Sequence, residues 1–178
     1  MKNHPVQIRS MLSRVFAGAL IPVLTAIVLL SATAPGVAAG RNPNPGIAPP
    51  NSTPYGKSYA EWQAAWYQWA FEAPADQNPV IDQTGEFCHI GQSGPVWFLA
   101  GTFGGSAERT VTVPVGKSLF FPLFNGSWWF PLDVPTEAEA RASVKAQMDG
   151  ATLLECHIDG VAVRNPFRYR AASPPGGY

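Results

Sequence analysis

The sequence predicts an α+β fold, in which an antiparallel β-sheet or partial β-sandwich carries two helices and one disulfide. Two capping boxes, SYAE from residue 58 and TEAE from residue 136, indicate the helix starts. Between them lie three segments rich in β-branched and aromatic residues: GPVWFLAGTF, RTVTVPV and KSLFFPLFNGSWWF. The later pair Asp159-Gly160, between two apolar runs, is typical of a type I′ hairpin turn. We therefore expect an N-terminal Trp-rich helix, strands, a second amphipathic helix and a hairpin.

The first 39 residues have the organisation of a secretory signal peptide. Basic residues precede an apolar run from Val15 to Leu30, and Val37-Ala38-Ala39 supplies the small residues that a signal peptidase reads. The apolar run is short for a membrane span, so we predict cleavage before Gly40 rather than a retained anchor. The mature protein is expected to be secreted or periplasmic, and not bound to the membrane after cleavage.

The remainder divides into three parts. Residues 40–54 are a flexible Pro/Asn-rich lead-in, residues 55–170 a single globular α+β domain, and residues 171–178 a tail. Three of the 12 Lys and Arg residues leave with the signal peptide, so nine remain against 12 Asp and Glu, a net charge near −3. That charge does not suit nucleic acid or anionic membrane. We expect a small-molecule ligand or substrate.

The two cysteines, Cys88 and Cys156, each begin a Cys-His-Ile sequence. An even cysteine count in an exported chain predicts a disulfide between them. Strand alternation in TLLECHI places Cys156 and His157 on opposite faces, so the pair is poorly arranged to bind one metal ion. The bridge would close a loop of about 69 residues and contribute about 4 kcal/mol.

The predicted first helix, residues 58–72, has an aromatic face. Tyr59, Trp62, Trp66 and Trp69 share it at helical spacing, and further apolar residues widen it. The functional interpretation is a sugar-stacking surface. The structural interpretation is that the tryptophans bury the helix against a sheet, and the breadth of the apolar arc favours it.

Three phrases in the chain, YGKSYAEWQAAWYQWAF, GQSGPVWFLAGTFGG and VPVGKSLFFPLFN, carry a resemblance. They are similar to phrases of exported bacterial proteins of unknown function, over roughly residues 54–165. The resemblance implies export and a shape, but no reaction and no functional residue. Proteins of this set usually continue with further strands, so an oligomer or a partner is expected if the sheet of this chain is incomplete.

An oxygen-rich stretch, FEAPADQNPVIDQTGEFCH, is the candidate metal site. Asp76, Asp82 and Glu86 are carboxylates of the kind that Ca²⁺ prefers, although their spacing is not that of an EF-hand. We therefore consider Ca²⁺ as a cofactor. The alternative is a solvated loop with Asx-turns before its prolines, and the composition favours that alternative.

The histidines that follow the cysteines are the candidate catalytic residues. If the two strands pair antiparallel at the bridge, His89 lies diagonally opposite Glu155 and His157 lies opposite Phe87. A histidine beside a carboxylate is a plausible general base. If the bridge instead joins two sheets, both histidines point outward to solvent.

Two function classes follow. In the first, the protein is an exported hydrolase of a carboxylic ester or lactone, assisted by a divalent cation, with His157, His89 and Glu155 as catalytic residues. Trp97, Trp128 and Trp129 would form its aromatic substrate-binding walls. In the second, it is a non-catalytic envelope module that binds a glycan, an acyl chain or another protein. The acidic loop beside the histidines favours the first class, and the lack of a nucleophile motif and the resemblance to proteins of unknown function favour the second. We expect the hydrolase, with the binding module as the alternative.

Overall fold

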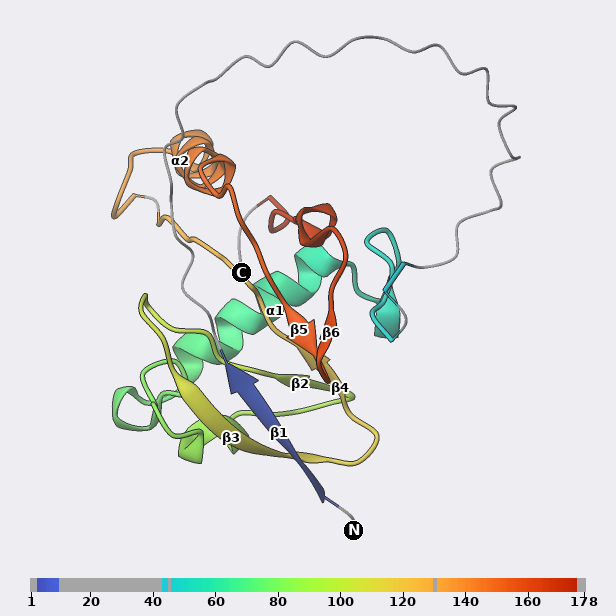
Figure 1. The fold of residues 1–178 in the computed structure, drawn as a ribbon. Helices are drawn as coiled ribbons and strands as arrows, with labels where there is room; N and C mark the ends of the chain where they lie inside the picture. Colours follow the sequence, from blue (N-terminus) through green and yellow to red (C-terminus); the bar gives the residue numbers. More distant parts are fainter. Residues whose placement is uncertain (1–2, 10–42, 45, 130, 176–178) are drawn as a thin grey trace, which may run out of the picture.

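The computed structural model describes residues 3–9, 43–44, 46–129 and 131–175 (Figure 1). Its helices are α1 (Tyr59–Glu72) and α2 (Glu137–Asp149). Its strands are β1 (Asn3–Arg9), β2 (Val96–Phe98), β3 (Glu108–Pro114), β4 (Ser118–Phe120), β5 (His157–Ile158) and β6 (Val161–Ala162). Four 3-10 helices complete the description: η1 (Pro54–Gly56), η2 (Ala75–Gln77), η3 (Glu86–His89) and η4 (Pro166–Tyr169). The predicted α+β class is confirmed.

The strands of the described residues form three two-stranded pairs rather than one sheet. β1 pairs with β3 and β5 pairs with β6, both antiparallel. β2 pairs with β4 in parallel, which the expected antiparallel sheet did not include. All three residues of β2 are buried, as is usual for strands of parallel pairs that are covered on both faces.

Helix α1 is buried along its tryptophan face. Ser58 accepts a hydrogen bond from the Glu61 backbone N–H and Glu61 accepts one from the Ser58 backbone, so the predicted capping box is present. The described core around the helix consists of Trp62, Trp66, Tyr67, Trp69, Ala70, Val80, Val96, Phe98 and Ala100. In Figure 1, α1 runs alongside β2 and β4. The structural interpretation of the tryptophans is confirmed.

Each of the three indoles also has a fixed backbone acceptor. Trp66 Nε1 donates to the Leu99 carbonyl oxygen at 2.9 Å, and Trp69 Nε1 donates to that of Ile90 at 2.7 Å. Trp62 Nε1 donates to a carbonyl oxygen of η1 at 3.0 Å. A buried indole N–H without an acceptor would cost free energy, so these bonds fix which strand and loop the helix packs against.

Helix α2 begins where the sequence predicts, and the hairpin turns at the predicted residues. Thr136 accepts a hydrogen bond from the Glu139 backbone N–H, and α2 ends before Gly150. Asp159 and Gly160 have φ angles of 51° and 78°, which suits the expected type I′ turn. The hairpin is shorter than expected, because only two residues on each side of the turn are strand.

The predicted disulfide is absent from the structure. Cys88 lies in η3, Cys156 lies just before β5, and both are free thiols. The expectation rested on export and the even cysteine count, and neither determines where the two thiols lie. Hydrogen bonds to the Asp82 side chain instead bend the chain before Cys88 into a turn and the helix η3.

The predicted signal peptide lies largely outside the described residues, as does the end of the tail. The described part of the predicted signal peptide, Asn3–Arg9, is strand β1. Among the described residues, no helix has the length and apolar character that a membrane span needs.

Candidate functional site

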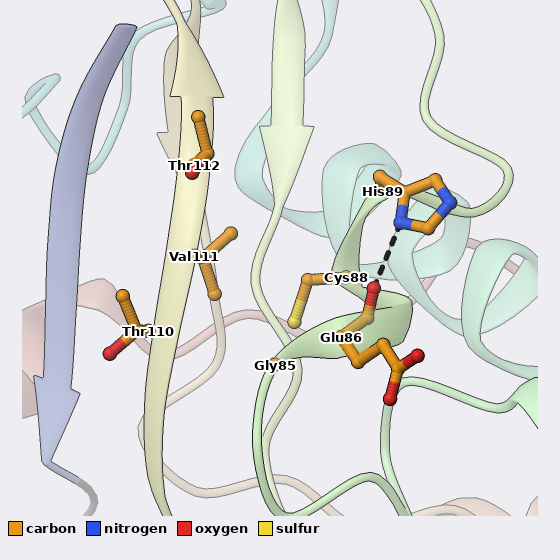
Figure 2. A pocket seen from close by; sticks show the side chains of 7 residues that line it. All are labelled: Gly85, Glu86, Cys88, His89, Thr110, Val111 and Thr112. Atoms are coloured by element: carbon orange, nitrogen blue, oxygen red, sulfur yellow. Dashed lines mark hydrogen bonds between the residues drawn. The ribbon is translucent and has the colours of Figure 1, made fainter.

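A cavity of about 230 Å³ lies between η3 and β3. It is lined by Gly85, Glu86, Cys88, His89, Thr110, Val111 and Thr112, as Figure 2 shows. Three residues that the sequence singled out, Glu86, Cys88 and His89, therefore lie together. The two β3 threonines across the cavity were not predicted as site residues.

Asp82 holds the loop that leads into η3 through its side-chain carboxylate. Its Oδ1 accepts hydrogen bonds from the backbone N–H and the hydroxyl of Thr84, both at 2.8 Å. Its Oδ2 accepts the backbone N–H groups of Gly85 at 2.9 Å and Phe87 at 3.0 Å. These four bonds use the acceptor positions of the carboxylate. Asp82 is therefore committed to shaping the loop, and it does not present oxygen atoms to a cation.

The hydrogen bonds also change the acidity of Asp82. Burial alone would raise the pKa of this carboxyl, but the hydrogen bonds from Thr84, Phe87 and Gly85 outweigh burial and hold the pKa below its ordinary value. Gly85 is required at the turn because its φ is 96° and a Cβ there would lie 2.6 Å from the Thr110 carbonyl oxygen.

Arg109 stabilises the same loop from the core side. Its Nε donates to the Asp82 carbonyl oxygen at 2.6 Å and its Nη2 to that of Val80 at 3.1 Å. Its Nη1 donates to the carbonyl oxygens of Ala100 and Gly101, both at 3.1 Å. Only 4% of the residue is exposed. Sequence reasoning missed this residue, although strand alternation places it on the same face as two buried valines of β3.

The ring orientation of His89 is set by η3. Its Nδ1 lies 2.9 Å from the Glu86 carbonyl oxygen, the contact drawn in Figure 2. A carbonyl oxygen only accepts hydrogen bonds, so Nδ1 carries the proton of the neutral ring and Nε2 carries the lone pair. The imidazole thus has the tautomer that a general base using Nε2 requires.

Cys88 is not suited to act as the nucleophile beside this histidine. The residue is 1% exposed. Burial, with a further contribution from the charge of Asp82 and an opposing one from Arg109, raises the pKa of the thiol to about 11. The thiol is therefore protonated near neutral pH, whereas nucleophilic cysteines are thiolates.

The other predicted catalytic residues do not join His89 in a strand ladder. β5 pairs with β6, so His157 lies opposite Ala162 rather than opposite Phe87. His89 belongs to a 3-10 helix, and Glu155 and His157 are exposed. The diagonal pairing of His89 with Glu155, one of the two alternatives, is therefore not formed, because it required both segments to be strands of one ladder.

The predicted calcium ligands are spread along the loop. Asp76 in η2 and Glu86 in η3 are exposed, and Asp82 is committed to backbone donors. Within the part of the chain that the structure describes, no group of three or more His, Cys, Asp or Glu side chains is arranged to hold a metal ion. Assistance by Ca²⁺ stays a prediction.

The three predicted wall tryptophans lie in different environments. Trp97 is buried in a second core cluster with Cys88, Leu99, Val111 and Val113. Its exposure of 8% leaves no ring face for a substrate. Trp128 and Trp129 are 44% and 40% exposed. The expectation of an aromatic binding surface therefore applies to these two residues alone.

A continuous series of ring contacts links Trp129 to the core. The Trp66 and Tyr67 rings meet edge to face at 5.3 Å, and Tyr67 stacks on Phe71 at 5.7 Å with an angle of 5°. Phe71 then meets Trp129 edge to face at 5.2 Å. Phe71 is 45% exposed. We name the three exposed residues Phe71, Trp128 and Trp129 the aromatic platform; the ring contact within it joins Phe71 and Trp129. Sequence reasoning assigned Phe71 only to the apolar arc of the helix.

A tight turn holds the backbone of Trp129. Its N–H donates to Asp133 Oδ2 at 2.8 Å, and its carbonyl oxygen accepts from the Asp133 and Val134 backbone N–H groups at 2.6 and 3.3 Å. The carboxylate of Asp133 therefore lies beside the backbone of a platform residue.

The chain matches no protein-family model, and no curated protein or solved structure is significantly similar to it. A functional assignment therefore depends on the geometry of the cavity and of the aromatic platform.

Proposed function

We propose that this protein is an exported, non-catalytic binding module that holds a sugar ring of a glycan on the aromatic platform. The observation that carries the proposal is the series of ring contacts from buried Trp66 through Tyr67 and Phe71 to exposed Trp129. Export of the protein is the expectation from its N-terminal sequence.

The ring contacts matter because they hold the exposed rings in place before a ligand arrives. An exposed side chain ordinarily loses rotamer freedom on binding, and that loss weakens affinity. The Phe71 ring contacts both the Tyr67 ring and the Trp129 ring, so its rotation is already restricted. The turn around Asp133 restricts the Trp129 backbone in the same way.

The chemistry of the platform suits a sugar better than an acyl chain. An all-equatorial sugar ring presents a flat face of C–H groups to an aromatic ring and hydroxyl groups around its rim. Asp133 supplies carboxylate oxygens near the platform, which accept hydrogen bonds from hydroxyl groups. An acyl chain calls for an enclosed apolar cavity, whereas the lining of the cavity at η3 includes Glu86, His89 and two threonines.

Binding of β-1,4-linked glucose and N-acetylglucosamine oligosaccharides, measured by calorimetry, tests the proposal. We expect Phe71→Ala and Trp129→Ala each to weaken binding roughly tenfold or more, as for truncation of central aromatic contacts. Phe103→Ala is the matched control, because Phe103 is 77% exposed. Equal affinity of all three variants, or no binding of either oligosaccharide, would contradict the proposal.

A second candidate function has one observation in its favour, the fixed tautomer of His89. In that proposal the cavity at η3 binds a small ester or lactone, and His89 Nε2 removes a proton from the attacking water. Thr110 and Thr112 lie across the cavity and offer hydroxyl groups to the substrate.

A panel of p-nitrophenyl esters and acylated lactones, assayed with and without a chelator, tests the second candidate. We expect His89→Ala to slow turnover by roughly 10²-fold, whereas His157→Ala leaves it unchanged. Activity that falls with the chelator and returns with Ca²⁺ would support the predicted metal assistance. No turnover of any substrate would remove the hydrolase candidate and leave the binding module.

A further inference from the structure

The backbone of β3 has two edges, and the structure shows which groups belong to each. The Thr110 backbone N–H donates to the Thr84 carbonyl oxygen at 3.1 Å. The Thr110 carbonyl oxygen also lies close to Gly85. The backbone groups of Thr110 therefore point toward the η3 loop. Because successive strand residues alternate, those of Arg109, Val111 and Val113 point to the opposite edge.

That opposite edge is paired with β1 along its whole length, as Figures 1 and 2 show. Arg109, Val111 and Val113 lie opposite Ile8, Val6 and His4. Pro5 lies opposite Thr112, and Pro114 lies opposite Asn3. Both prolines thus occupy positions where a backbone N–H would point away from the partner strand. The ladder loses no hydrogen bond to either proline.

β1 lies within the segment that the sequence predicts to be removed on export. Cleavage before Gly40 would remove β1 and uncover the backbone groups of Arg109, Val111 and Val113. Natural edge strands are usually protected by lysine, proline or a bulge near the middle. The charged residues and the proline of β3, Glu108, Arg109 and Pro114, lie toward its two ends, and its centre, Thr-Val-Thr-Val, has none of these. The uncovered edge would therefore be open to another strand.

We propose that, after the leader is removed, the β3 edge pairs antiparallel with the β3 edge of a second copy of this chain. A two-fold axis at Val111 places the two Val111 residues opposite each other, in the position that exchanges both hydrogen bonds. Thr110 then lies opposite Thr112 of the second copy, and Arg109 opposite Val113. Glu108 lies opposite Pro114, so no like charges meet.

The threonine pairs support this arrangement. Thr110 and Thr112 are exposed, and opposite threonines on antiparallel strands interact favourably. A strand with the same charge at both positions would repel its own copy. The proposal depends on the predicted cleavage, but not on the proposed glycan binding.

The full chain is expressed in an exporting bacterial host, and the exported and unexported forms are compared by sedimentation velocity and N-terminal sequencing. We expect the exported form to begin at Gly40 and to have twice the mass of one chain, whereas the unexported form is a monomer. An exported monomer that begins at Gly40 would overturn the proposal. Retention of residues 3–9 on the exported protein would overturn it as well.

Two matched variants test the register. T110K/T112K creates two lysine–lysine pairs across the proposed axis and should raise the dimer dissociation constant several-fold. T110E/T112K creates two glutamate–lysine pairs and should keep the dimer. Circular dichroism and thermal unfolding check that both variants fold, since both positions are exposed. Equal dissociation constants for the two variants, each folded, would exclude this pairing.

Discussion

Arg109 Nε donates to the Asp82 carbonyl oxygen at 2.6 Å. The buried guanidinium of β3 therefore holds the backbone of Asp82, and the carboxylate of the same residue accepts the backbone N–H of Phe87 in η3. The same guanidinium reaches Val80 and the segment after β2. Burial lowers the pKa of Arg109, while Cys88 and Asp82 act in the opposite direction. One side chain thus joins the segment from Val80 to Asp82 with the segment of Ala100 and Gly101.

Arg109→Ala should lower the free energy of unfolding by roughly 3 kcal/mol or more, because four backbone carbonyl oxygens lose their donor. Urea unfolding followed by tryptophan fluorescence measures this change. Arg168→Ala, at an exposed position, is the matched control and should change stability by less than about 0.5 kcal/mol. A similar small change for both variants would show that Arg109 is not needed for stability.

Asp82 should make stability depend on acid pH. Its folded-state pKa is below the ordinary value of 3.8, so its contribution is complete above that value and is lost as the pH falls through the lower folded-state pKa. Asp82→Asn should flatten this part of the stability profile. Urea unfolding of both proteins from neutral to acid pH measures the difference. Parallel profiles would contradict the role assigned to the carboxylate.

The structure predicts two thiols rather than a disulfide. Burial raises the pKa of both Cys88 and Cys156. Cys88 is the more deeply buried, so it should react with a thiol reagent only as the protein unfolds. Thiol titration of Cys88→Ser and Cys156→Ser, with and without denaturant, separates the two rates. An intact mass lower than that of the reduced chain by two hydrogen atoms would instead support the disulfide expected from the sequence.

Trp66→Ala should lower the free energy of unfolding by about 3–5 kcal/mol, because it empties a core position and leaves the Leu99 carbonyl oxygen without its indole donor. Trp128→Ala is the matched control for the removal of an indole, since Trp128 is exposed. Thermal or urea unfolding measures both. Wild-type stability of Trp66→Ala would mean that the helix is not anchored through this residue.

The features that the sequence predicted well are those encoded by neighbouring residues. The capping boxes at Ser58 and Thr136 and the turn at Asp159-Gly160 depend on contacts within a few residues. The burial of the α1 tryptophans followed from the width of their apolar arc. In each case local chemistry was sufficient.

The features that were missed depend on contacts between distant segments. The disulfide was inferred from compartment and cysteine count, neither of which contains the positions of Cys88 and Cys156. The metal interpretation counted Asp82 as a ligand, whereas the structure uses its carboxylate for backbone N–H groups. Contact between Phe71 and Trp129, 58 positions later, has no signature in either local sequence.

The most direct measurement of the proposed function is an NMR titration of the indole N–H signals with β-1,4-linked glucose and N-acetylglucosamine oligosaccharides. Trp128→Phe and Trp129→Phe assign the two platform signals. We predict that both move on addition of ligand, whereas the signals of Trp66 and Trp69, which donate to backbone carbonyl oxygens in the core, stay in place. Platform signals that do not move with either oligosaccharide would contradict the assignment of glycan binding to the aromatic platform.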